Sequence, residues 1–444
     1  MIVKLALSIY HLLTSCFFGV IFLPLWTYLF FVGDKERVLR QRMGHYPRKL
    51  SEALKSAPRI WLHAASVGEV KAAISIMAVL KRDLPGCGLV LSTFTAQGYK
   101  SAKTLVGQNP VLADTVCVIA PIDVVWVVRR VLLTFKPDVL AFLETELWPN
   151  LIFQAHMLGI KTVLINGRIS DRSINRYLKI RPLIKGVLST MAGFSVIGEI
   201  DAERFGRLGA PDNRISVGGN AKFDLLELPD MVLRDRLRVL YGLKGCEPVF
   251  VAGSIRGDED ELMLAAFGQV KLLIPETIMI LAPRHLNRIE RIEARLREQG
   301  LAFQKRSALD GNNKTRQAQV IILDTIGELH QTYGIASVVF CGGSLVPLGG
   351  QNILEPAAWG KPVLFGPSMG DFKEARDLLV DAGGAVEVTD ADDLAGHLAD
   401  LLKFPDKAQK MGQLAQTAVM SNKGAAQKHA DIIMAAVNGK IDPA

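Results

Sequence analysis

The sequence predicts an α/β protein with two halves, each a parallel β-sheet covered by helices. Short apolar runs alternate with helical stretches along most of the chain, which is the pattern of consecutive βαβ units. The 444 residues exceed what one hydrophobic core usually holds, so two domains are expected. Loops rich in glycine and charged residues follow several apolar runs, as they do where parallel strands end at a ligand site.

The first 33 residues are expected to form a membrane anchor. No Asp, Glu, Lys or Arg occurs between residues 5 and 33, and about 20 apolar residues cross a bilayer as a helix. A basic cluster follows over 35–49, against Lys4 alone before the segment, so the rest of the chain is expected in the cytoplasm. An anchor that lies on the membrane surface is the alternative. Either form would hold the chain at an anionic membrane face.

The net charge and the cysteine usage limit the classes of partner and the cellular compartment that are expected. The net charge of +8 suits an anionic partner, which could be nucleic acid, a phosphate-bearing substrate or an acidic membrane surface. The five cysteines are scattered and lack Cys-x-x-Cys spacing. This usage indicates buried thiols in a reducing compartment and no zinc site.

The first half, residues 34–225, contains six apolar runs that are expected to be parallel strands. They span residues 59–63, 88–94, 115–119, 138–143, 161–166 and 194–197. Periodic helical stretches such as 70–82 and 124–135 fill the gaps. Because such sheets bind ligands at the carboxyl ends of their strands, the loops that follow the strands are the places to search for a site.

The loop after the first strand, HAASVGE at 63–69, ends in a candidate carboxylate. Ser66 could cap a helix, and Gly68 permits a tight turn. Glu69 has two interpretations. It could be a first-turn acid favoured by the helix dipole, worth about 0.3–1 kcal/mol, or a carboxylate that takes a proton from an incoming hydroxyl. The pattern by itself favours the first.

Three further loops of this half carry charged candidates. Glu144 and Glu146 follow the fourth strand, and residues two apart in an extended segment share a face. Because neighbouring carboxylates tend to separate in pKa, one is expected to be functional and the other structural. Arg168 follows the next strand and is a candidate ligand for a phosphate or carboxylate. Lys222 leaves a glycine loop at the end of this half, with a solvated lysine as the alternative.

The second half repeats the pattern after a polar helical stretch at 226–245. Its strands are expected at 248–254, 278–282, 319–323, 336–340, 362–365 and 384–388. Gly253 and Ser254 could present backbone amides to a phosphate. Arg284 and His285 form a basic pair after Pro283, at the end of a strand, which fits a phosphate or acid group.

A glycine-rich stretch occupies residues 341–367 between two of these strands. Four glycines, at 342, 343, 349 and 350, precede a helix that is expected to open near Asn352. Glycine lets backbone amides approach a ligand closely, and Glu355 in the first helical turn could accept from sugar hydroxyls. The stretch is neither G-x-G-x-x-G nor a Walker loop, so a tight crossover that needs glycine for packing is the alternative.

Two α/β halves of similar size, with charged loops in both, describe the GT-B fold of nucleotide-sugar enzymes. This fold has two Rossmann-like domains that face a central cleft. The expected domains are the anchor at 1–33, a first Rossmann-like domain at 34–225 and a second at 226–444.

The loops resemble those of the Kdo (3-deoxy-D-manno-octulosonic acid) transferases of lipopolysaccharide synthesis, which form glycosyltransferase family 30. These are membrane-bound GT-B enzymes that use a CMP-sugar. The matching segments occur in the family's order and are HAASVGE (63–69), ETELWPN (144–150), NGR (166–168), GNAKFD (219–224), PRH (283–285), GEL (327–329), GGSL (342–345) and GQNILEP (350–356).

The resemblance implies an inverting transfer of Kdo from CMP-Kdo to a lipid A precursor, lipid IVA. Glu69 would be the general base, and Glu144 and Lys222 would stabilise the transition state. The first domain would bind the lipid and the second CMP-Kdo. From the motifs and the loop pattern together, the candidates for binding substrate or CMP are Ser66, Gly68, Arg168, Ser254, Pro283, Arg284, His285, Ile326, Gly327, Glu328, Gly343, Gly350, Gln351, Asn352, Ile353, Leu354 and Glu355.

No metal or other cofactor is expected, because Arg284, Lys222 and helix N-termini can take the charge of the leaving phosphate. The expected partners are CMP-Kdo, the lipid A precursor and an anionic membrane surface, without nucleic acid. The expected location is the bacterial inner membrane, with the catalytic domains in the cytoplasm. Another GT-B sugar-nucleotide enzyme and a non-catalytic paralogue that binds lipid A are the alternatives.

Three sites depart from the commoner family pattern. Gln351 stands where the family often has histidine, Ile255-Arg256 where it has Thr-His, and Leu286 where a proline often follows Arg-His. Gln351 can still donate and accept hydrogen bonds, and Arg256 could compensate for lost contacts. The departures therefore concern the fine contacts and not the reaction class.

Overall fold

The computed structural model describes residues 9–15, 35–54, 56–226, 229–245, 247–309 and 316–440. The chain forms two compact units. Unit 1 comprises Met1–Leu225 and Asn422–Ala444, and unit 2 comprises Leu226–Ser421. The expected second domain ran from 226 to 444, but the structure assigns the last segment, from Asn422, to unit 1.

Unit 1 is built on a seven-stranded parallel sheet with the strand order β3-β2-β1-β4-β5-β6-β7. The strands are β1 (Arg59–His63), β2 (Gly88–Thr93), β3 (Val116–Ile119), β4 (Val139–Leu143), β5 (Lys161–Gly167), β6 (Gly193–Val196) and β7 (Ile215–Val217). The six expected strands all occur, with ends shifted by about a residue, which is normal for strand boundaries. β7 was not expected, because its three residues are mostly exposed and give no apolar signal.

Besides the helical residues 9–15, ten α-helices and three 3₁₀ turns have assigned bounds in the described part of unit 1. The helices are α2 (Lys35–Arg42), α3 (Arg48–Glu52), α4 (Val67–Asp83), α5 (Ala96–Gln108), α6 (Val125–Phe135), α7 (Pro149–Met157), α8 (Asp171–Lys179), α9 (Arg181–Ser189), α10 (Glu199–Leu208) and α19 (Ala425–Val437). The 3₁₀ turns are η1 (Pro110–Leu112), η2 (Asp212–Arg214) and η3 (Ala221–Leu225).

Alternate side chains of the unit 1 strands pack into two separate cores. On β1, Ile60 and Leu62 pack with residues of α4, α5 and α19, whereas Trp61 packs on the other face with residues of α6, α7 and α9. This alternation is the two-residue period of a strand that is covered on both faces. The layers are therefore helix, sheet and helix.

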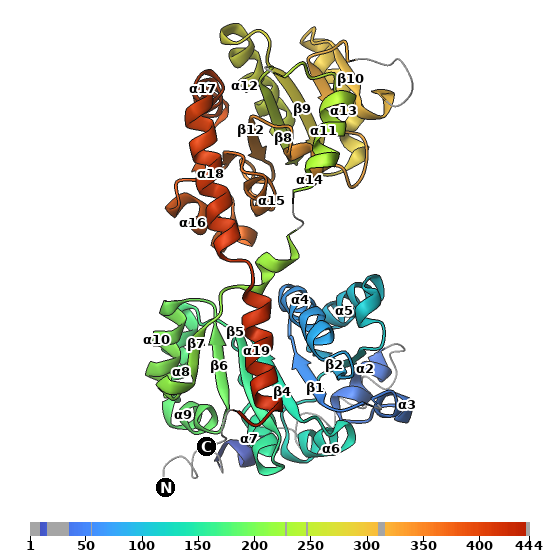
Figure 1. Cartoon of the computed structure of the whole chain (residues 1–444), viewed down its shortest axis with the longest axis vertical. Helices are drawn as coiled ribbons and strands as arrows, with labels where there is room; N and C mark the ends of the chain where they lie inside the picture. Colours follow the sequence, from blue (N-terminus) through green and yellow to red (C-terminus); the bar gives the residue numbers. More distant parts are fainter. Residues whose placement is uncertain are drawn as a thin grey trace. The chain divides into compact units, whose positions relative to one another are not determined.

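The C-terminal helix α19 belongs to unit 1 because its apolar face completes one of these cores. Ala426, Ala430 and Ile433 are spaced four and three residues apart, so they lie on one side of the helix and pack against the sheet beside α4. Figure 1 shows α19, drawn in red, lying among the elements of unit 1. A helix with this face would leave apolar area exposed if it stood alone.

Unit 2 has a second seven-stranded parallel sheet, in the order β10-β11-β9-β8-β12-β13-β14. The strands are β8 (Val249–Ile255), β9 (Ile278–Pro283), β10 (Phe303–Lys305), β11 (Val320–Ile322), β12 (Val338–Cys341), β13 (Val363–Phe365) and β14 (Ala385–Glu387). All six expected strands occur here too. The short edge strand β10 was not expected, because none of its residues is fully buried.

Helices cover both faces of this sheet, and α12 packs beside α17 over one of them. The helices are α11 (Met231–Leu240), α12 (Glu259–Leu273), α13 (Ile289–Glu298), α14 (Leu329–Tyr333), α15 (Leu354–Ala358), α16 (Lys373–Asp381), α17 (Ala391–Lys403) and α18 (Pro405–Ser421). The 3₁₀ turns are η4 (Leu286–Arg288), η5 (Arg306–Leu309) and η6 (Gly370–Phe372). The helix expected to open near Asn352 begins at Leu354.

The expected membrane anchor falls mostly outside the described residues, because 1–8 and 16–34 are not among them. Residues 9–15 are helical and contact the rest of unit 1, where Tyr10 donates to Asp123 Oδ2 (3.0 Å) and Asn150 donates to Thr14 Oγ1 (3.2 Å). Among the described residues, no helix has the length and apolar character needed to cross a membrane. The spanning anchor stays a prediction.

Candidate active site

In unit 1 the candidate catalytic residues lie where the strand order reverses. β1 pairs with β2 on one side and with β4 on the other. Parallel sheets bind ligands at the carboxyl ends of strands beside such a reversal, because the loops there diverge. Glu69 follows β1 and Glu144 follows β4, while Lys222 comes from η3.

Glu69 takes part in the start of α4. Ser66 is the N-cap residue, and its Oγ accepts a hydrogen bond from the Glu69 N–H (3.3 Å). In return, Glu69 Oε2 accepts from the Ala65 N–H (2.8 Å). This reciprocal pattern is close to a capping box. Glu69 is therefore an acid of the first helical turn, as the first interpretation holds. Only Oε2 is used in this role, so it is compatible with proton transfer at Oε1.

The environment of Glu69 favours the protonated carboxyl. The residue is 6% exposed, and burial raises its pKa to about 7. The charges of Glu144 and Glu146 also act to raise this pKa, whereas the hydrogen bonds with Ser66 and Ala65 act to lower it. A carboxylate with a pKa near neutrality can both accept and release a proton at physiological pH.

Glu144 and Lys222 form an ion pair beside the start of α4. Lys222 Nζ lies 2.7 Å from Glu144 Oε1, and a Cβ added to Gly68 would lie 3.7 Å from Lys222 Nζ. Glu144 has a φ of 54°, a left-handed conformation that costs free energy for a residue with a side chain. Such backbone strain is common at functional sites. Lys222 is thus a paired residue and not the freely solvated lysine of the alternative.

The second carboxylate of this loop has different partners. Glu146 Oε2 accepts from Trp148 Nε1 (2.7 Å) and lies 3.8 Å from His63 Nε2. Burial acts to raise the pKa of Glu146, but its contacts with His63 and Trp148 outweigh that effect and lower it. The structure therefore separates the two carboxylates, with Glu144 on the lysine and Glu146 on the buried aromatic cluster.

Arg168 lies just beyond β5, and its charge acts on an acidic residue of α10, Asp201. Asp201 Oδ1 also accepts from the Ile169 N–H (2.7 Å). The expected role of Arg168 as a phosphate or carboxylate ligand stays a prediction.

In unit 2 the strand order reverses between β8 and β12, which pair directly. Ser254 has a φ of 54°, at the point where the pairing of β8 with β9 shifts register. Gly342 follows β12, and a Cβ there would lie 2.5 Å from Ile255 Cα. Only glycine fits at this contact, so the interpretation of Gly342 as a residue needed for packing is correct.

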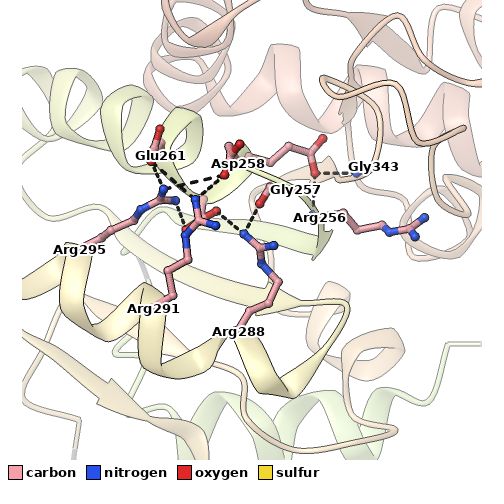
Figure 2. Close-up of polar contacts among 10 residues, drawn as sticks. Arg256, Gly257, Asp258, Glu261, Arg288, Arg291, Arg295 and Gly343 are labelled. Carbon is pink, nitrogen blue, oxygen red and sulfur yellow. Dashed lines mark hydrogen bonds and ion pairs between the residues drawn. The ribbon is translucent and has the colours of Figure 1, made fainter.

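A buried carboxylate that no sequence motif indicates holds the glycine loop of unit 2. Glu259 accepts hydrogen bonds from four backbone N–H groups, and the contact to Gly343 is drawn in Figure 2. The donors are Arg256 (2.8 Å), Gly343 (2.6 Å), Ser344 (2.9 Å) and Leu345 (2.9 Å). The Gly343 amide, which was expected to face a ligand, is thus bonded within the protein. The sequence did not indicate Glu259, because Glu259 is one of several acidic residues in the first turn of α12.

Arginines of η4 and α13 bind the acidic residues at the start of α12 (Figure 2). Asp260 is 1% exposed and pairs with Arg288 (3.2 Å) and Arg295. Further contacts join Arg291 to Asp258 and Glu261, and Arg295 to Glu261. Because these residues flank Glu259, the network fixes the helix start from which Glu259 reaches the glycine loop.

The basic pair after β9 lies beside the end of β8. The Arg284 N–H donates to Ile255 O (3.0 Å), which fixes the backbone between Pro283 and His285. The Arg284 and His285 side chains are exposed, as a pair that receives a ligand must be. Their role in CMP binding stays a prediction.

In the segment 326–328, the carboxylate of Glu328 is already bonded within the protein, so the backbone is the better candidate for contacts with a ligand. Glu328 pairs with Arg306 (2.9 Å) and accepts from Thr325 Oγ1 (2.7 Å). Gly327 has a φ of 89°, and Ile326 is 86% exposed. The Glu328 side chain is therefore engaged within unit 2.

Two of the residues that depart from the family pattern meet at the same glycine. A Cβ added to Gly343 would lie 3.3 Å from Arg256 Cδ and 3.5 Å from Gln351 Nε2. The Gly350 N–H donates to Gly343 O (2.8 Å), which closes the loop beneath them. Arg256 and Gln351 therefore both lie next to Gly343, and compensation by Arg256 stays a prediction.

The start of α15 is ordered by its own side chains. Asn352 Nδ2 donates to Glu355 Oε1 (3.0 Å), and the Leu354 N–H donates to Asn352 Oδ1 (3.2 Å). Ile353 is fully buried and anchors the segment. Its contacts with a sugar nucleotide stay predictions.

Two Rossmann-like units, each with polar residues at its strand reversal, define a protein of the GT-B class. The solved structure of UDP-GlcNAc 2-epimerase from Neisseria meningitidis, bound to UDP-GlcNAc, has the same fold. It superposes with a TM-score of 0.53 at 13% identity and covers 85% of this chain and 99% of its own.

Sequence relatives then identify the family. The family model described as 3-deoxy-D-manno-octulosonic-acid transferase (kdotransferase) matches residues 37–225. The 3-deoxy-D-manno-octulosonic acid transferase of Haemophilus influenzae is 34% identical over 84% of this chain and 86% of its own length. That of Bordetella pertussis is 31% identical over 85% and 87%. The chain therefore belongs to the Kdo transferase family, as its motifs predicted, and is a glycosyltransferase.

Proposed function

We propose that the protein transfers Kdo from CMP-Kdo to a hydroxyl of a lipid A precursor, lipid IVA, in lipopolysaccharide synthesis. Glu69 carries the proposal. It is a buried carboxylate beside the Lys222–Glu144 pair, with a pKa raised to about 7 by burial. An acceptor hydroxyl needs a base of this kind, because its own proton is too weakly acidic to leave unaided.

The transfer is a single displacement at the anomeric carbon of Kdo. The acceptor oxygen bonds to that carbon while the bond from the carbon to the CMP phosphate oxygen breaks. The hydroxyl proton passes to Glu69, and CMP leaves as an anion. One displacement inverts the anomeric configuration, so a β-linked donor gives an α-linked product.

Lys222 and Glu144 act together in this step. The Lys222 ammonium stabilises the negative charge that develops in the transition state, and Glu144 holds the ammonium in place at 2.7 Å. A fixed charge of this kind loses no reorganisation energy when the reaction occurs.

The donor side belongs to unit 2. Arg284 and His285 are exposed at the end of β9, where a phosphate can reach them. On this side Arg284 takes the charge of the leaving phosphate without a metal ion. Turnover that is unchanged in excess EDTA is the expected result, and loss of turnover with recovery on adding Mg²⁺ would contradict it.

The proposal also includes the cytoplasmic face of the bacterial inner membrane, with the N-terminal segment as anchor. Unit 1 exposes Trp126 and Leu133 on α6, and the Arg130 guanidinium lies 5.5 Å from the Trp126 ring centre. Aromatic, apolar and basic side chains together suit an anionic lipid surface. Co-sedimentation of the full chain with phosphatidylglycerol vesicles is expected to exceed that with phosphatidylcholine vesicles.

The experiment that tests the reaction is incubation of the full chain with CMP-Kdo and tetra-acylated lipid A precursor. Mass spectrometry counts the sugars added. A mass increase by one or more Kdo units is expected. A product formed only from a UDP-sugar would favour another GT-B transferase, and binding of the lipid without any product would favour the non-catalytic paralogue.

A further inference from the structure

His429 of α19 is a fully buried histidine that contacts the loop in front of Lys222. Its Nε2 lies 2.9 Å from Gly219 O, and its Nδ1 lies 2.7 Å from Ser195 Oγ. A carbonyl oxygen can only accept, so Nε2 carries the proton and donates. Nδ1 then accepts from the Ser195 hydroxyl and from the Asn166 N–H (3.4 Å). The ring is neutral in this arrangement, and burial lowers its pKa to about 4.

The loop is shaped to receive this ring. A Cβ added to Gly218 would lie 2.6 Å from His429 Cε1 and 2.5 Å from Ser195 Oγ, so a larger residue would displace the imidazole. Gly219 has a φ of 93°, which turns its carbonyl toward the ring. Gly218 therefore leaves room for the His429 ring, and Gly219 provides the carbonyl that the ring contacts.

The next residues of the loop are held equally firmly. The Ala221 N–H donates to Asn166 Oδ1 (2.9 Å), and Asn166 itself has a φ of 50°. The Lys222 N–H donates to Asn220 Oδ1 (3.0 Å). The backbone before Lys222 is thus fixed through His429 and Asn166.

α19 also contacts the loop after Lys222, at Asp224. Asp224 accepts from the backbone N–H groups of Gly424 (2.6 Å) and Ala426 (2.7 Å), at the start of α19. Two contacts with one helix therefore bracket Lys222, at Gly219 and at Asp224. This helix lies outside the residues that the family model matches, 37–225.

We propose that α19 positions the catalytic lysine, and that His429 is the positioning residue that sets the loop through its bond to Gly219. The inference rests on the proposed role of Lys222 in transfer. Loss of the His429–Gly219 bond lets the loop shift, and the Lys222 ammonium then moves relative to Glu144 and the reacting atoms. Because a misplaced charge lowers the rate more than it weakens ground-state binding, the effect falls on kcat.

Two near-isosteric substitutions separate positioning from packing. In His429→Gln, the side-chain amide reaches the place of Nε2 and can donate to Gly219 O. In His429→Asn, the amide reaches only the place of Nδ1, so the Gly219 bond is lost. We expect His429→Asn to lower kcat by about 10- to 100-fold with KM values within about twofold, and His429→Gln to restore most of the rate. Equal rates for both variants would overturn the proposal.

A control on the same helix accounts for general destabilisation. Ile433→Val removes one methyl group from the core beneath α19 and leaves in place the hydrogen bonds of His429 with Gly219 and of Asp224 with Ala426. It should lower the melting temperature and leave kcat unchanged. A fall in kcat in Ile433→Val that matches His429→Asn would reduce His429 to a packing residue.

A double-mutant cycle with Lys222→Ala separates the positioning role of His429 from the catalytic role of Lys222. If His429 acts through Lys222, adding His429→Asn to Lys222→Ala should slow turnover no further. Additive losses would overturn the positioning role while leaving Lys222 catalytic. Normal turnover in Lys222→Ala by itself would instead refute the proposed function of Lys222, and the positioning role with it.

Discussion

Lys222 Nζ and Glu144 Oε1 are 2.7 Å apart, although the two residues are 78 positions apart in the chain. Their side chains are 33% and 20% exposed, so the pair is partly screened by water. Such a pair contributes little to stability, and its position beside Gly68 matters chiefly for the charge that it places at the strand reversal. Substitutions of Lys222 or Glu144 should therefore change the reaction rate more than the stability of the protein.

Lys222→Ala should lower turnover more than it weakens substrate binding. The ammonium is expected to act on charge that develops in the transition state, and loss of one such group costs about 10²- to 10³-fold in kcat. Steady-state kinetics with CMP-Kdo and lipid acceptor measures the split between kcat and KM. Lys100→Ala, at an exposed position of α5, is the matched control and should behave as the parent. A rise in KM with kcat unchanged would move Lys222 to a binding role.

Glu69→Gln should abolish transfer while CMP binding persists. The glutamine can still accept the Ala65 N–H bond, so the start of α4 is kept, but it cannot take a proton at neutral pH. Activity by mass spectrometry and CMP affinity by calorimetry test the two parts. Near-normal turnover would remove the base assignment.

The same substitution should stabilise the protein at alkaline pH. The folded-state pKa of Glu69 is raised from 4.5 to about 7 by burial, so between these values the folded protein holds a proton that the unfolded chain releases. The cost of ionising Glu69 therefore appears as the pH rises and is complete above about 7. Glu69→Gln should gain on the order of 1–3 kcal/mol at pH 8 and nothing below pH 4. Denaturant titrations at both pH values measure the difference, and an equal effect at both would contradict the raised pKa.

The raised pKa also predicts the pH profile of the reaction. A general base must be ionised, so kcat/KM should fall below pH of about 7 and drop about tenfold per unit further down. Because the Glu144 charge helps to raise this pKa, residual activity of Glu144→Gln should show its midpoint at lower pH. A midpoint that stays in place would separate the profile from Glu69.

Glu259→Gln should weaken binding of the nucleotide by unit 2. The glutamine NH₂ would face backbone N–H groups that now donate to a carboxylate oxygen, and each unsatisfied buried group costs about 1–3 kcal/mol. We expect CMP affinity to fall at least about tenfold as the glycine loop loses its support. Glu290→Gln, at an exposed position of α13, is the control. Unchanged CMP affinity in Glu259→Gln would show that the loop does not hold the donor.

Asp260→Ala should destabilise unit 2 far more than a surface pair does. Asp260 is buried between Arg288 and Arg295, and removing one partner of a buried ion pair costs roughly 3–5 kcal/mol. Asp235→Ala breaks the exposed pair with Arg234 and should cost less than about 1 kcal/mol. Chemical denaturation compares the two variants. Equal losses would mean that the network in Figure 2 is not a stabilising one.

The sequence by itself determined the two-sheet organisation and the family. Parallel strands buried on both faces are continuous apolar runs, and the loops that follow them are fixed by local chain order. For that reason Glu69, Glu144 and Arg284 could be placed at strand ends from the sequence, and the motifs that carry them predicted the family correctly.

Only the tertiary structure decided which distant groups meet. α19 covers the sheet of unit 1 rather than unit 2, because its apolar face fits beside α4, and this choice is invisible in a helix read by itself. Glu259 is one acid among several at a helix start until the glycine loop folds onto it. His429 reaches Gly219 across 210 positions of sequence. Contacts of this kind depend on how elements pack, and periodicity and local propensity carry no information about that packing.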